Sequence, residues 1–475
     1  MSGKADEDIS RLVYTTLDTF GYHLESVSFR SKVYDYMSNI ATLCNSREGI
    51  PHSVVFVGSL GEGVGLSDSD TDTMVIIGDT ICVDKASAQR HFNILELDYA
   101  TSPPGYTKIV PVSLDKEKDS YAWFKSSYMY ISQTGCPYIS SAVFCKTAYK
   151  MVEKISTNRY DGLNKTEMTN NGPATTRTIE ALGEHDIVPS IYVFGGDHLR
   201  KWKDRTRLNT WPSINLVQEI SQKEGYIVPV GDKLSDSQIL EWRICYTTAE
   251  KKLISTLNDV QVKLYVLLKL IGKKILKPVC KDITSYIVKN VVFWVVETNQ
   301  ESSFSPELLL KLVQKSLFYL KYCLENNHFP NYMIPDRNLL NIVFGHYKTK
   351  VIRFLSDCLK EEGSIVVRVP KLRELMYCKL TSIERTIYRD WRNEVEERLF
   401  KCMTQRAEHI TFSMMLKSTF LYDLEYEFFK DGRYMETNLK FVNMFVPEWF
   451  QLMLGGRIRE INELFLRRLE AVRPL

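Results

Sequence analysis

The chain has no excess of charge of one sign and no long apolar run. Its 475 residues include 61 Lys and Arg against 58 Asp and Glu, which gives a net charge of +3. Such a balance excludes a surface that is basic throughout, so any basic surface must be local. No window approaches the roughly 20 apolar residues of a membrane span, and the acidic, polar start is unlike a signal peptide. We therefore expect a soluble, cytoplasmic protein.

Glycine, proline and clustered cysteines are also scarce. The 23 glycines and 16 prolines are too few and too scattered for a fibrous or disordered chain. The ten cysteines form no C-x-x-C pair and no Cys/His cluster with zinc spacing. We expect reduced, mostly buried thiols and no structural zinc.

The residue pattern changes along the chain from helical to strand-like and back to helical. Residues 8–45 have the apolar spacing of a long helix, interrupted near Gly21. From Ser53 onward, β-branched runs between Gly- and Pro-rich turns predict a sheet that ends near Trp211. Within it, the polar stretch 157–178 predicts a surface loop. Beyond this part, nearly every window has helical period.

This order predicts an α+β fold with two lobes, because 475 residues exceed what one hydrophobic core usually organises. A long leading helix would brace a mixed β-sheet lobe and an all-helical lobe. The expected segments are a leading helix over 1–50, an α/β lobe over 51–212, a helical lobe over 213–347 and a helical extension over 348–475. A ligand cleft between the lobes is the default expectation.

The segment 58–75, GSLGEGVGLSDSDTDTMV, carries the clearest chemical signal. Alternate residues of a strand share a face, so Asp70 and Asp72 would lie about 6–7 Å apart at Cα and point the same way. Carboxylates so placed suit a pair of magnesium ions that assist in-line displacement at phosphorus. The turn at Gly58 and Ser59 offers backbone N–H groups and a hydroxyl to phosphates.

Two simpler interpretations compete with this one. A run of aspartates is usually a solvated turn, and an isolated D-x-D pair is a weak signal. Asp68, Asp70 and Asp72 also resemble the start of a calcium-binding loop. That second interpretation fails, because Thr73 stands where the loop requires glycine and Asp79 where it requires glutamate.

The combination of features resembles the nucleotidyltransferase superfamily. A strand, Gly-Ser, about eleven residues, D-x-D and an apolar strand follow one another in that order. The spacing is most similar to the branch of cyclic GMP-AMP synthase and male-abnormal-twenty-one (Mab) proteins. HDIVPSIYV, ahead of Trp211-Pro212, resembles the strand with the third metal-binding carboxylate, which places that role on Asp186. WRICYTTAEKKL, from Trp242, is similar to the opening of the family's helical lobe.

Two further motifs extend the resemblance to about residues 53–345. SYIVKNVVFWVVE resembles a family helix whose lysine contacts nucleotide phosphates, which implies that role for Lys289. NYMIPDRNLL is similar to N-Y-F-I-P-x-x-N-L, and counting back from it places Tyr319 where the family stacks a tyrosine on a base. The alternatives are that Lys289 snorkels from an apolar helix and that Tyr319 packs in the core.

The resemblance implies a cyclic GMP-AMP synthase-like receptor of innate immunity. Such an enzyme binds nucleic acid and joins ATP and GTP, or other nucleoside triphosphates, into a cyclic dinucleotide with release of pyrophosphate. Asp70, Asp72 and Asp186 would hold two Mg²⁺ ions, with Mn²⁺ as a substitute, while Gly58 and Ser59 would cradle the triphosphate. A catalytically silent Mab-type binding protein and an oligoadenylate-type polymerase remain open as alternatives.

Lysines over residues 261–281 indicate where nucleic acid would bind. This stretch holds six lysines and no acid: Lys263, Lys269, Lys273, Lys274, Lys277 and Lys281. A second basic cluster precedes Trp211 and contains Arg200, Lys201, Lys203, Arg205 and Arg207. A helical lysine stripe neutralises backbone phosphates without reading sequence, which favours double-stranded RNA over double-stranded DNA. The alternative is an ordinary solvated face.

Overall fold

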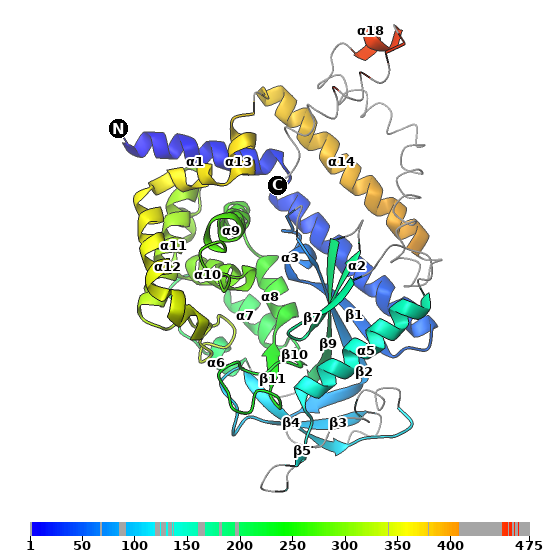
Figure 1. The fold of residues 1–475 in the computed structure, drawn as a ribbon. Helices are drawn as coiled ribbons and strands as arrows, with labels where there is room; N and C mark the ends of the chain where they lie inside the picture. The colour runs from blue at the N-terminus through cyan, green and yellow to red at the C-terminus, as the bar shows by residue number, and fades with distance from the viewer. Residues whose placement is uncertain are drawn as a thin grey trace.

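A computed structural model shows a mixed α+β fold (Figure 1). It describes residues 2–66, 69–84, 92–118, 124, 130–131, 135, 137–159, 167–179, 183–194, 199–340, 342–378, 380–407, 449–454, 456–457, 460 and 464. Asp68 and most of the predicted extension beyond residue 407 lie outside these residues. The cysteines whose environment is described are free thiols, and most are buried, as the sequence predicts.

The leading helix is broken where the sequence predicts. Helix α1 (Ser2–Thr19) and helix α2 (Leu24–Arg47) are separated at Gly21, whose φ of 89° lies in the left-handed region that favours glycine. Helix α1 packs on the helices of the second half of the chain, while α2 packs on the first strand of the sheet. The two helices therefore link the two kinds of structure in the chain.

One sheet dominates the first half of the fold. Its strands within the described residues are β1 (His52–Val57), β2 (Thr71–Val83), β3 (Asn93–Asp98), β4 (Tyr106–Ser113), β7 (Glu167–Asn171), β8 (Ala174–Ile179), β9 (Gly183–Phe194), β10 (Gly225–Val228) and β11 (Trp242–Cys245). They are ordered β1-β2-β3-β4-β11-β10-β9-β8-β7, and β2 also pairs with β9 in parallel. This extra pairing places the two longest strands side by side.

Two predictions about this sheet are wrong. The stretch 157–178 is not a loop throughout, because β7 and β8 form an antiparallel hairpin around Gly172. Nor does the sheet end near Trp211, since β10 and β11 pair with β9 and β4. The short strand at Trp242 has an apolar spacing that also fits a helix, so only its pairing with β4 and β10 distinguishes the two.

Shorter elements surround the sheet. They are α3 (Gly58–Gly61), β5 (Tyr130–Ile131), β6 (Pro137–Tyr138), α5 (Ser141–Arg159), α6 (Arg200–Lys203) and α7 (Ile214–Ser221). Helix α3 directly follows β1 and is a single turn. Helix α7 begins at Ser213, whose side chain accepts a hydrogen bond from the Leu216 backbone N–H. The position of α3, between β1 and β2, places it at the candidate site.

Helices make up the region that follows β11. They are α8 (Thr247–Ile254), α9 (Asp259–Ile271), the π-helical turn η1 (Gly272–Leu276), α10 (Ser285–Thr298), the 3₁₀ turns η2 (Glu301–Ser303) and η3 (Pro306–Leu308), α11 (Leu309–Glu325), α12 (Ile342–Lys360), the 3₁₀ helix η4 (Glu362–Arg368), α13 (Pro370–Met376), α14 (Ser382–Ala407) and α18 (Trp449–Leu454). Asn258 and Gln261 form a capping box that starts α9. Helix α14 lies beside α1 and α2 (Figure 1).

A continuous apolar core joins the sheet to the helices. It contains Val13 of α1, Ile191 of β9, Trp242 of β11, Leu264 of α9 and Phe293 of α10, all nearly inaccessible to solvent. Helix α9 is buried along almost its whole length, so other elements surround it on all sides. Of the helices described, none is long and apolar enough to cross a membrane.

Candidate functional site

Asp72 of β2 and Asp186 of β9 lie directly opposite each other. The two strands are parallel and pair residue by residue from Thr71 and His185 onward, which aligns Asp72 with Asp186. Paired residues of neighbouring strands point to the same face, with backbones about 5 Å apart. The predicted second and third carboxylates of the site, more than 110 positions apart in sequence, therefore come together.

The environment of Asp72 raises its pKa to about 7, well above the ordinary value for an aspartate. Burial of the carboxyl group is the largest cause, followed by repulsion from Asp186 and Asp70. The nearby Lys289 ammonium lowers the pKa, but by less. This site therefore concentrates negative charge, which a divalent cation would offset.

Asp70 and Asp186 differ in their surroundings. Asp70 immediately precedes β2 and is exposed, so it stands at the open side of the site. Asp186 is half-buried, and its Oδ1 accepts a hydrogen bond of 2.5 Å from the Thr176 hydroxyl of β8. Thr176 in turn accepts a hydrogen bond from the Asn171 amide. The sequence analysis missed Thr176, because it lies in the stretch predicted to be a loop.

Carboxylate oxygens are the ligands that Mg²⁺ prefers, so the types of donor fit the predicted metal. In the part of the chain that the structure describes, no three Asp, Glu, His or Cys side chains lie close enough to form a ready-made metal site. Asp72 and Asp186 are thus brought together by strand pairing, while Asp70 does not complete a closed cluster with them.

The predicted phosphate-binding turn packs against Asp72. Gly58 starts α3 with a φ of 64°, and a Cβ atom added there would lie 1.9 Å from Asp72 Oδ2. Only glycine permits both the backbone conformation and this approach. The Ser59 hydroxyl lies 3.4 Å from the Ser69 hydroxyl, which itself accepts a hydrogen bond from the Leu66 N–H. The turn therefore contacts Asp72 through Gly58 and the residues ahead of β2 through Ser59.

Lys289 is held between two buried glutamates. Its Nζ lies 2.6 Å from Glu62 Oε1 and 3.1 Å from Glu250 Oε2. All three side chains are buried, and the two carboxylates hold the pKa of Lys289 well above its usual range although burial alone would lower it. Tyr265 donates to Glu62 and Tyr286 to Glu250, so both carboxylates have further donors.

Glu62 is the second residue that the sequence analysis missed. It is the only acid between Gly58 and Ser67 and follows α3 directly, so its position in the glycine-rich segment was the available signal. Through Glu62 the turn contacts Lys289 of α10, which the resemblance implies to be a phosphate ligand. Contact of Lys289 with a nucleotide stays a prediction.

The reverse face of the paired strands is not acidic. His185 and Thr73 point there, since they alternate with Asp186 and Asp72, and the Thr73 hydroxyl lies 2.7 Å from His185 Nε2. Burial, with a smaller contribution from Arg177, lowers the pKa of His185 to about 4. His185 is therefore neutral at pH 7, and the acidic groups lie on one face only.

Tyr319 lies on α11 and is half-buried. Its ring packs edge-on against Phe329 at 5.9 Å between centroids, and the ring also contacts the main core. Burial raises the pKa of its hydroxyl, with a further contribution from Cys323. Part of the ring is thus in the core, as the alternative interpretation expects, and stacking of the remaining surface on a base stays a prediction.

The expected basic face requires a correction. Lys263 and Lys269 lie in the fully surrounded helix α9 and are only 0% and 5% exposed, so they cannot contact nucleic acid. Lys263 pairs with Asp259 and with Asp18, and its Nζ lies over the Tyr14 ring. The lysine spacing suggested a solvated stripe, but the surrounding helices cover it.

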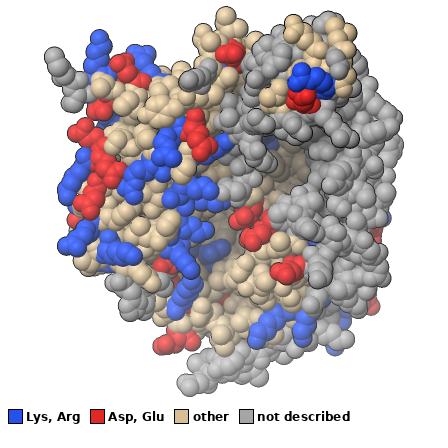
Figure 2. All heavy atoms as spheres, turned by 45° about the horizontal axis from the view of Figure 1, so that its top comes forward, with Lys and Arg blue, Asp and Glu red and all other residues tan. Residues whose placement is uncertain are grey.

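The other lysines of this stretch lie nearer the surface. Lys274, Lys277 and Lys281 are exposed, and Lys273 is half-buried. On the side of the molecule that Figure 2 shows, Lys and Arg side chains gather over the half that the helices occupy. They lie beside a hollow, with acidic side chains among them. The surface that remains for the predicted nucleic-acid contact is thus shorter than the sequence suggests.

The second basic cluster is largely structural. Arg205 and Arg207 both pair with the buried Glu297, at 2.7 and 3.3 Å. Their guanidinium groups also stack on aromatic rings, Arg205 on Trp294 at 4.4 Å and Arg207 on a tryptophan of α6. Lys201 pairs with Asp336. These contacts join α6 and the segment after it to the helices.

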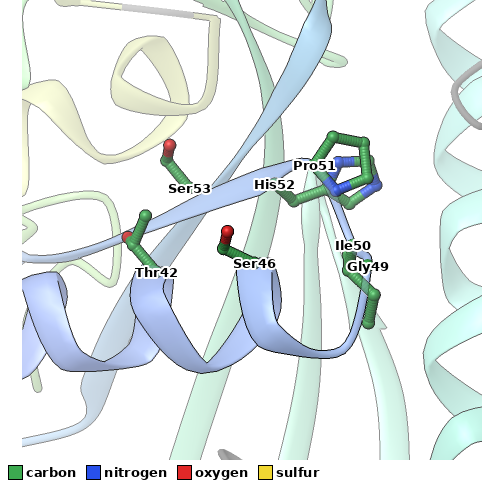
Figure 3. Close-up of a pocket in the computed structure, with 7 residues that line it drawn as sticks. All are labelled: Thr42, Ser46, Gly49, Ile50, Pro51, His52 and Ser53. Atoms are coloured by element: carbon green, nitrogen blue, oxygen red, sulfur yellow. The ribbon is translucent and has the colours of Figure 1, made fainter.

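A separate cavity of about 350 Å³ lies at the other end of β1, where α2 ends (Figure 3). Thr42 and Ser46 of α2 and Ser53 of β1 contribute hydroxyls to it, and the lining residues include neither lysine nor arginine. Thr42 is already bonded to the backbone of Val54. Strand β1 separates this cavity from Gly58 by its whole length, so it is not part of the acidic site.

Comparisons with known proteins agree with the motifs. Residues 261–361 match the family described as the Mab-21 protein HhH/H2TH-like domain. The chain is also 25% identical over 287 residues to a cyclic GMP-AMP synthase-like receptor of Magallana gigas. That alignment covers 56% of this chain and 46% of the relative, so the chain spans about half the length of this curated relative.

Proposed function

Because this chain is a member of the Mab-21 and cyclic GMP-AMP synthase-like nucleotidyltransferase family, we propose that it joins two nucleoside triphosphates into a cyclic dinucleotide when nucleic acid binds. The observation that carries this proposal is the opposition of Asp72 and Asp186, with the Gly58 turn packed against Asp72. The sheet and the helical region would form the two lobes that hold the substrates. ATP and GTP are the proposed substrates, and the product would act in innate immune signalling.

Each group at the site has a proposed role. When bound, two Mg²⁺ ions held by Asp70, Asp72 and Asp186 would supply charge stabilisation for the phosphates. Asp186 would accept the proton of the attacking ribose hydroxyl, and the hydrogen bond from Thr176 would fix the orientation of its carboxylate. Positioning of this kind, with electrostatic stabilisation, accounts for most of the acceleration in phosphoryl transfer.

The chain's own donors would bind the triphosphate. The backbone N–H groups of the turn at Gly58 and the Ser59 hydroxyl would surround the phosphates. Lys289 would offset their charge, and Tyr319 would stack on a base with the exposed part of its ring. Both groups come from the helical region, so substrate binding would draw that region and the sheet together.

Double-stranded RNA is the proposed activator, and the exposed lysines Lys274 and Lys277, with Lys273, are the proposed contacts. They follow α9 directly, and Lys269 in the last turn of α9 donates a hydrogen bond to the Val64 carbonyl in the segment after α3. Lysine ammonium groups bind backbone phosphates by charge and without sequence readout. The proposed site of action is the cytoplasm.

Product analysis tests the proposal. Purified protein is incubated with the four ribonucleoside triphosphates and Mg²⁺, with double-stranded RNA, double-stranded DNA or neither, and the products are resolved by mass. We expect a cyclic dinucleotide that depends on RNA. Linear oligonucleotides would indicate the polymerase alternative, and no product under any condition would refute the proposed activity.

A variant of the proposed metal ligands tests whether the product is made at this site. D70N/D72N removes two carboxylate charges and should lower turnover by at least about 100-fold, while RNA binding is unchanged. The control is D357N, which makes one such Asp-to-Asn change at an exposed ion pair on α12. Equal turnover in D70N/D72N and wild type would refute the assignment of the metal ligands.

A further inference from the structure

Helix α14, in the part of the chain that no family motif covers, docks at the break between α1 and α2. Its Tyr388 packs on Phe20 at 5.2 Å between ring centroids, and Asn393 accepts a hydrogen bond of 2.9 Å from Ser26. The Arg392 guanidinium lies against Gly21, where an added Cβ atom would meet it at 1.7 Å. The glycine that breaks the leading helix thus also makes room for α14.

Arg30 of α2 connects α14 to the segment that follows the phosphate-binding turn. One end of its guanidinium, Nη1, lies 3.3 and 3.4 Å from the two carboxylate oxygens of Glu396 on α14. Its Nη2 donates to the Gly21 carbonyl at 2.6 Å, and its Nε donates to the Gly63 carbonyl at 2.9 Å. One side chain therefore contacts α14, the break in the leading helix and the glycine-rich segment.

Further bonds hold the glycine-rich segment against α2 and against the break that precedes it. Ser31 donates to the Gly61 carbonyl at 3.0 Å, and Tyr22 donates to the Gly65 carbonyl at 3.0 Å. Gly63 has a φ of 77°, and an added Cβ atom would lie 2.1 Å from the Val27 carbonyl oxygen. Residues 61–65 are therefore packed directly on the α2 backbone.

The same segment contacts Lys289 on its other side. Glu62 lies between Gly61 and Gly63, whose carbonyls α2 binds, and its carboxylate pairs with Lys289 at 2.6 Å. The Lys289 ammonium is buried and has two carboxylate partners, so in this arrangement it is not presented to a phosphate. Movement of residues 61–65 away from α10 would remove one of these partners.

We propose that α14 restrains the phosphate-binding turn through Arg30 and keeps the enzyme in a resting state. This inference rests on the proposed function, and it assigns to Arg30 the role of a positioning residue. Arg30, which pairs with Glu396, binds the Gly63 carbonyl. This contact positions the neighbouring Glu62, whose carboxylate pairs with Lys289. Release of α14 frees Glu62 to leave Lys289, which makes the ammonium available to a triphosphate.

Hydrogen exchange tests the restraint without any substrate. E396Q removes the charge that holds Arg30 and that also pairs with Arg392 of α14 at 2.8 Å, and N393A removes the separate tie to Ser26. The control is D390N, which makes the same change as E396Q on an exposed residue of α14 whose partner is Arg389. We expect amide exchange over residues 59–66 to be about threefold to tenfold faster in E396Q, and faster in N393A, than in D390N or wild type. Equal exchange in all four proteins would overturn the inference.

Turnover supplies the second readout. E396Q should raise product formation in the absence of nucleic acid by about the same factor, with little change in the stimulated rate. A faster exchange with no rise, or a fall, in unstimulated turnover would show that the tie supports activity, and would also overturn the inference. If wild type and E396Q form no product under any condition, the proposed function fails, while the exchange rates still decide whether α14 restrains the turn.

Discussion

Lys289 Nζ lies 2.6 Å from Glu62 Oε1, which joins the glycine-rich segment to helix α10 through a buried ion pair. Glu250 is the second partner of Lys289, at 3.1 Å. A buried charge is tolerated in a protein when an opposite charge and hydrogen bonds compensate for the loss of water. The lysine and the two glutamates therefore depend on one another, and their variants should not be additive.

We predict that K289M destabilises the protein by about 3–5 kcal/mol, because it leaves two buried carboxylates without their cation. The triple variant E62Q/E250Q/K289M should recover most of this loss, since it removes all three charges. K281M, at an exposed lysine, is the control and should change the unfolding free energy by less than about 0.5 kcal/mol. Thermal and urea unfolding measure these differences, and a triple variant no more stable than K289M would contradict the prediction.

Gly58 offers a test of the contact between the turn and Asp72. G58A should lower turnover by about 100-fold, because the new Cβ atom meets Asp72 Oδ2 at 1.9 Å and must displace it. G172A is the matched control: its φ of 63° is nearly the same, but nothing lies within 4 Å of an added Cβ atom. Both variants should lose about 1–2 kcal/mol of stability from backbone strain. Similar turnover in the two variants would refute a positional role for Gly58.

The buried Lys269 should make the unfolding free energy of the protein depend on pH. Burial, with repulsion from Lys289 and Lys273, lowers its pKa to about 7, although Glu62 raises it. Between pH 7 and its unfolded pKa near 10.5, the unfolded chain binds the proton and the folded protein does not. The contribution of Lys269 to stability is therefore lowest below pH 7 and rises with pH, by up to about 1.4 kcal/mol per pH unit.

The variant K269M removes the charge with little change in side-chain volume. It also removes the hydrogen bond to the Val64 carbonyl, but the change between two pH values reports the charge. We expect K269M to be more stable than wild type at pH 7, and this advantage should shrink by about 1–3 kcal/mol at pH 9. Unfolding of both proteins at the two pH values gives the difference directly. A stability difference that is the same at pH 7 and pH 9 would show that Lys269 does not change its charge in this range.

The exposed lysines after α9 should contribute to RNA binding. K274E/K277E should weaken binding of double-stranded RNA and reduce the slope of log K against log salt by about 2, one for each lost phosphate contact. K116E/K233E reverses the same number of charges at exposed lysines near the sheet and is the control. Binding is measured by titration at several salt concentrations. Equal salt slopes for the two double variants would place the RNA-binding surface elsewhere.

Local sequence patterns predicted several elements correctly for identifiable reasons. The break at Gly21 follows from a glycine within a helical pattern, and β1, β2 and β9 follow from β-branched runs. The hairpin β7–β8 and the strand β11 were missed, because polar threonine-rich strands and short apolar strands have no distinctive pattern. Strand β11 pairs with β10 and with the remote β4, and this pairing is what makes it a strand.

The residues themselves specified the chemistry of the candidate site: the aspartates around a Gly-Ser turn, an apolar strand with a third aspartate, and a lysine on an apolar helix. Side-chain type and local spacing suffice for this, because alternation along a strand is a local property. Long-range packing determined everything else. It aligned Asp72 with Asp186, buried Lys263 and Lys269, paired Lys289 with Glu62 and seated α14 on Gly21. Each of these depends on which distant segments meet, and the physical cause is burial and charge compensation in a shared core, which no local window of sequence contains.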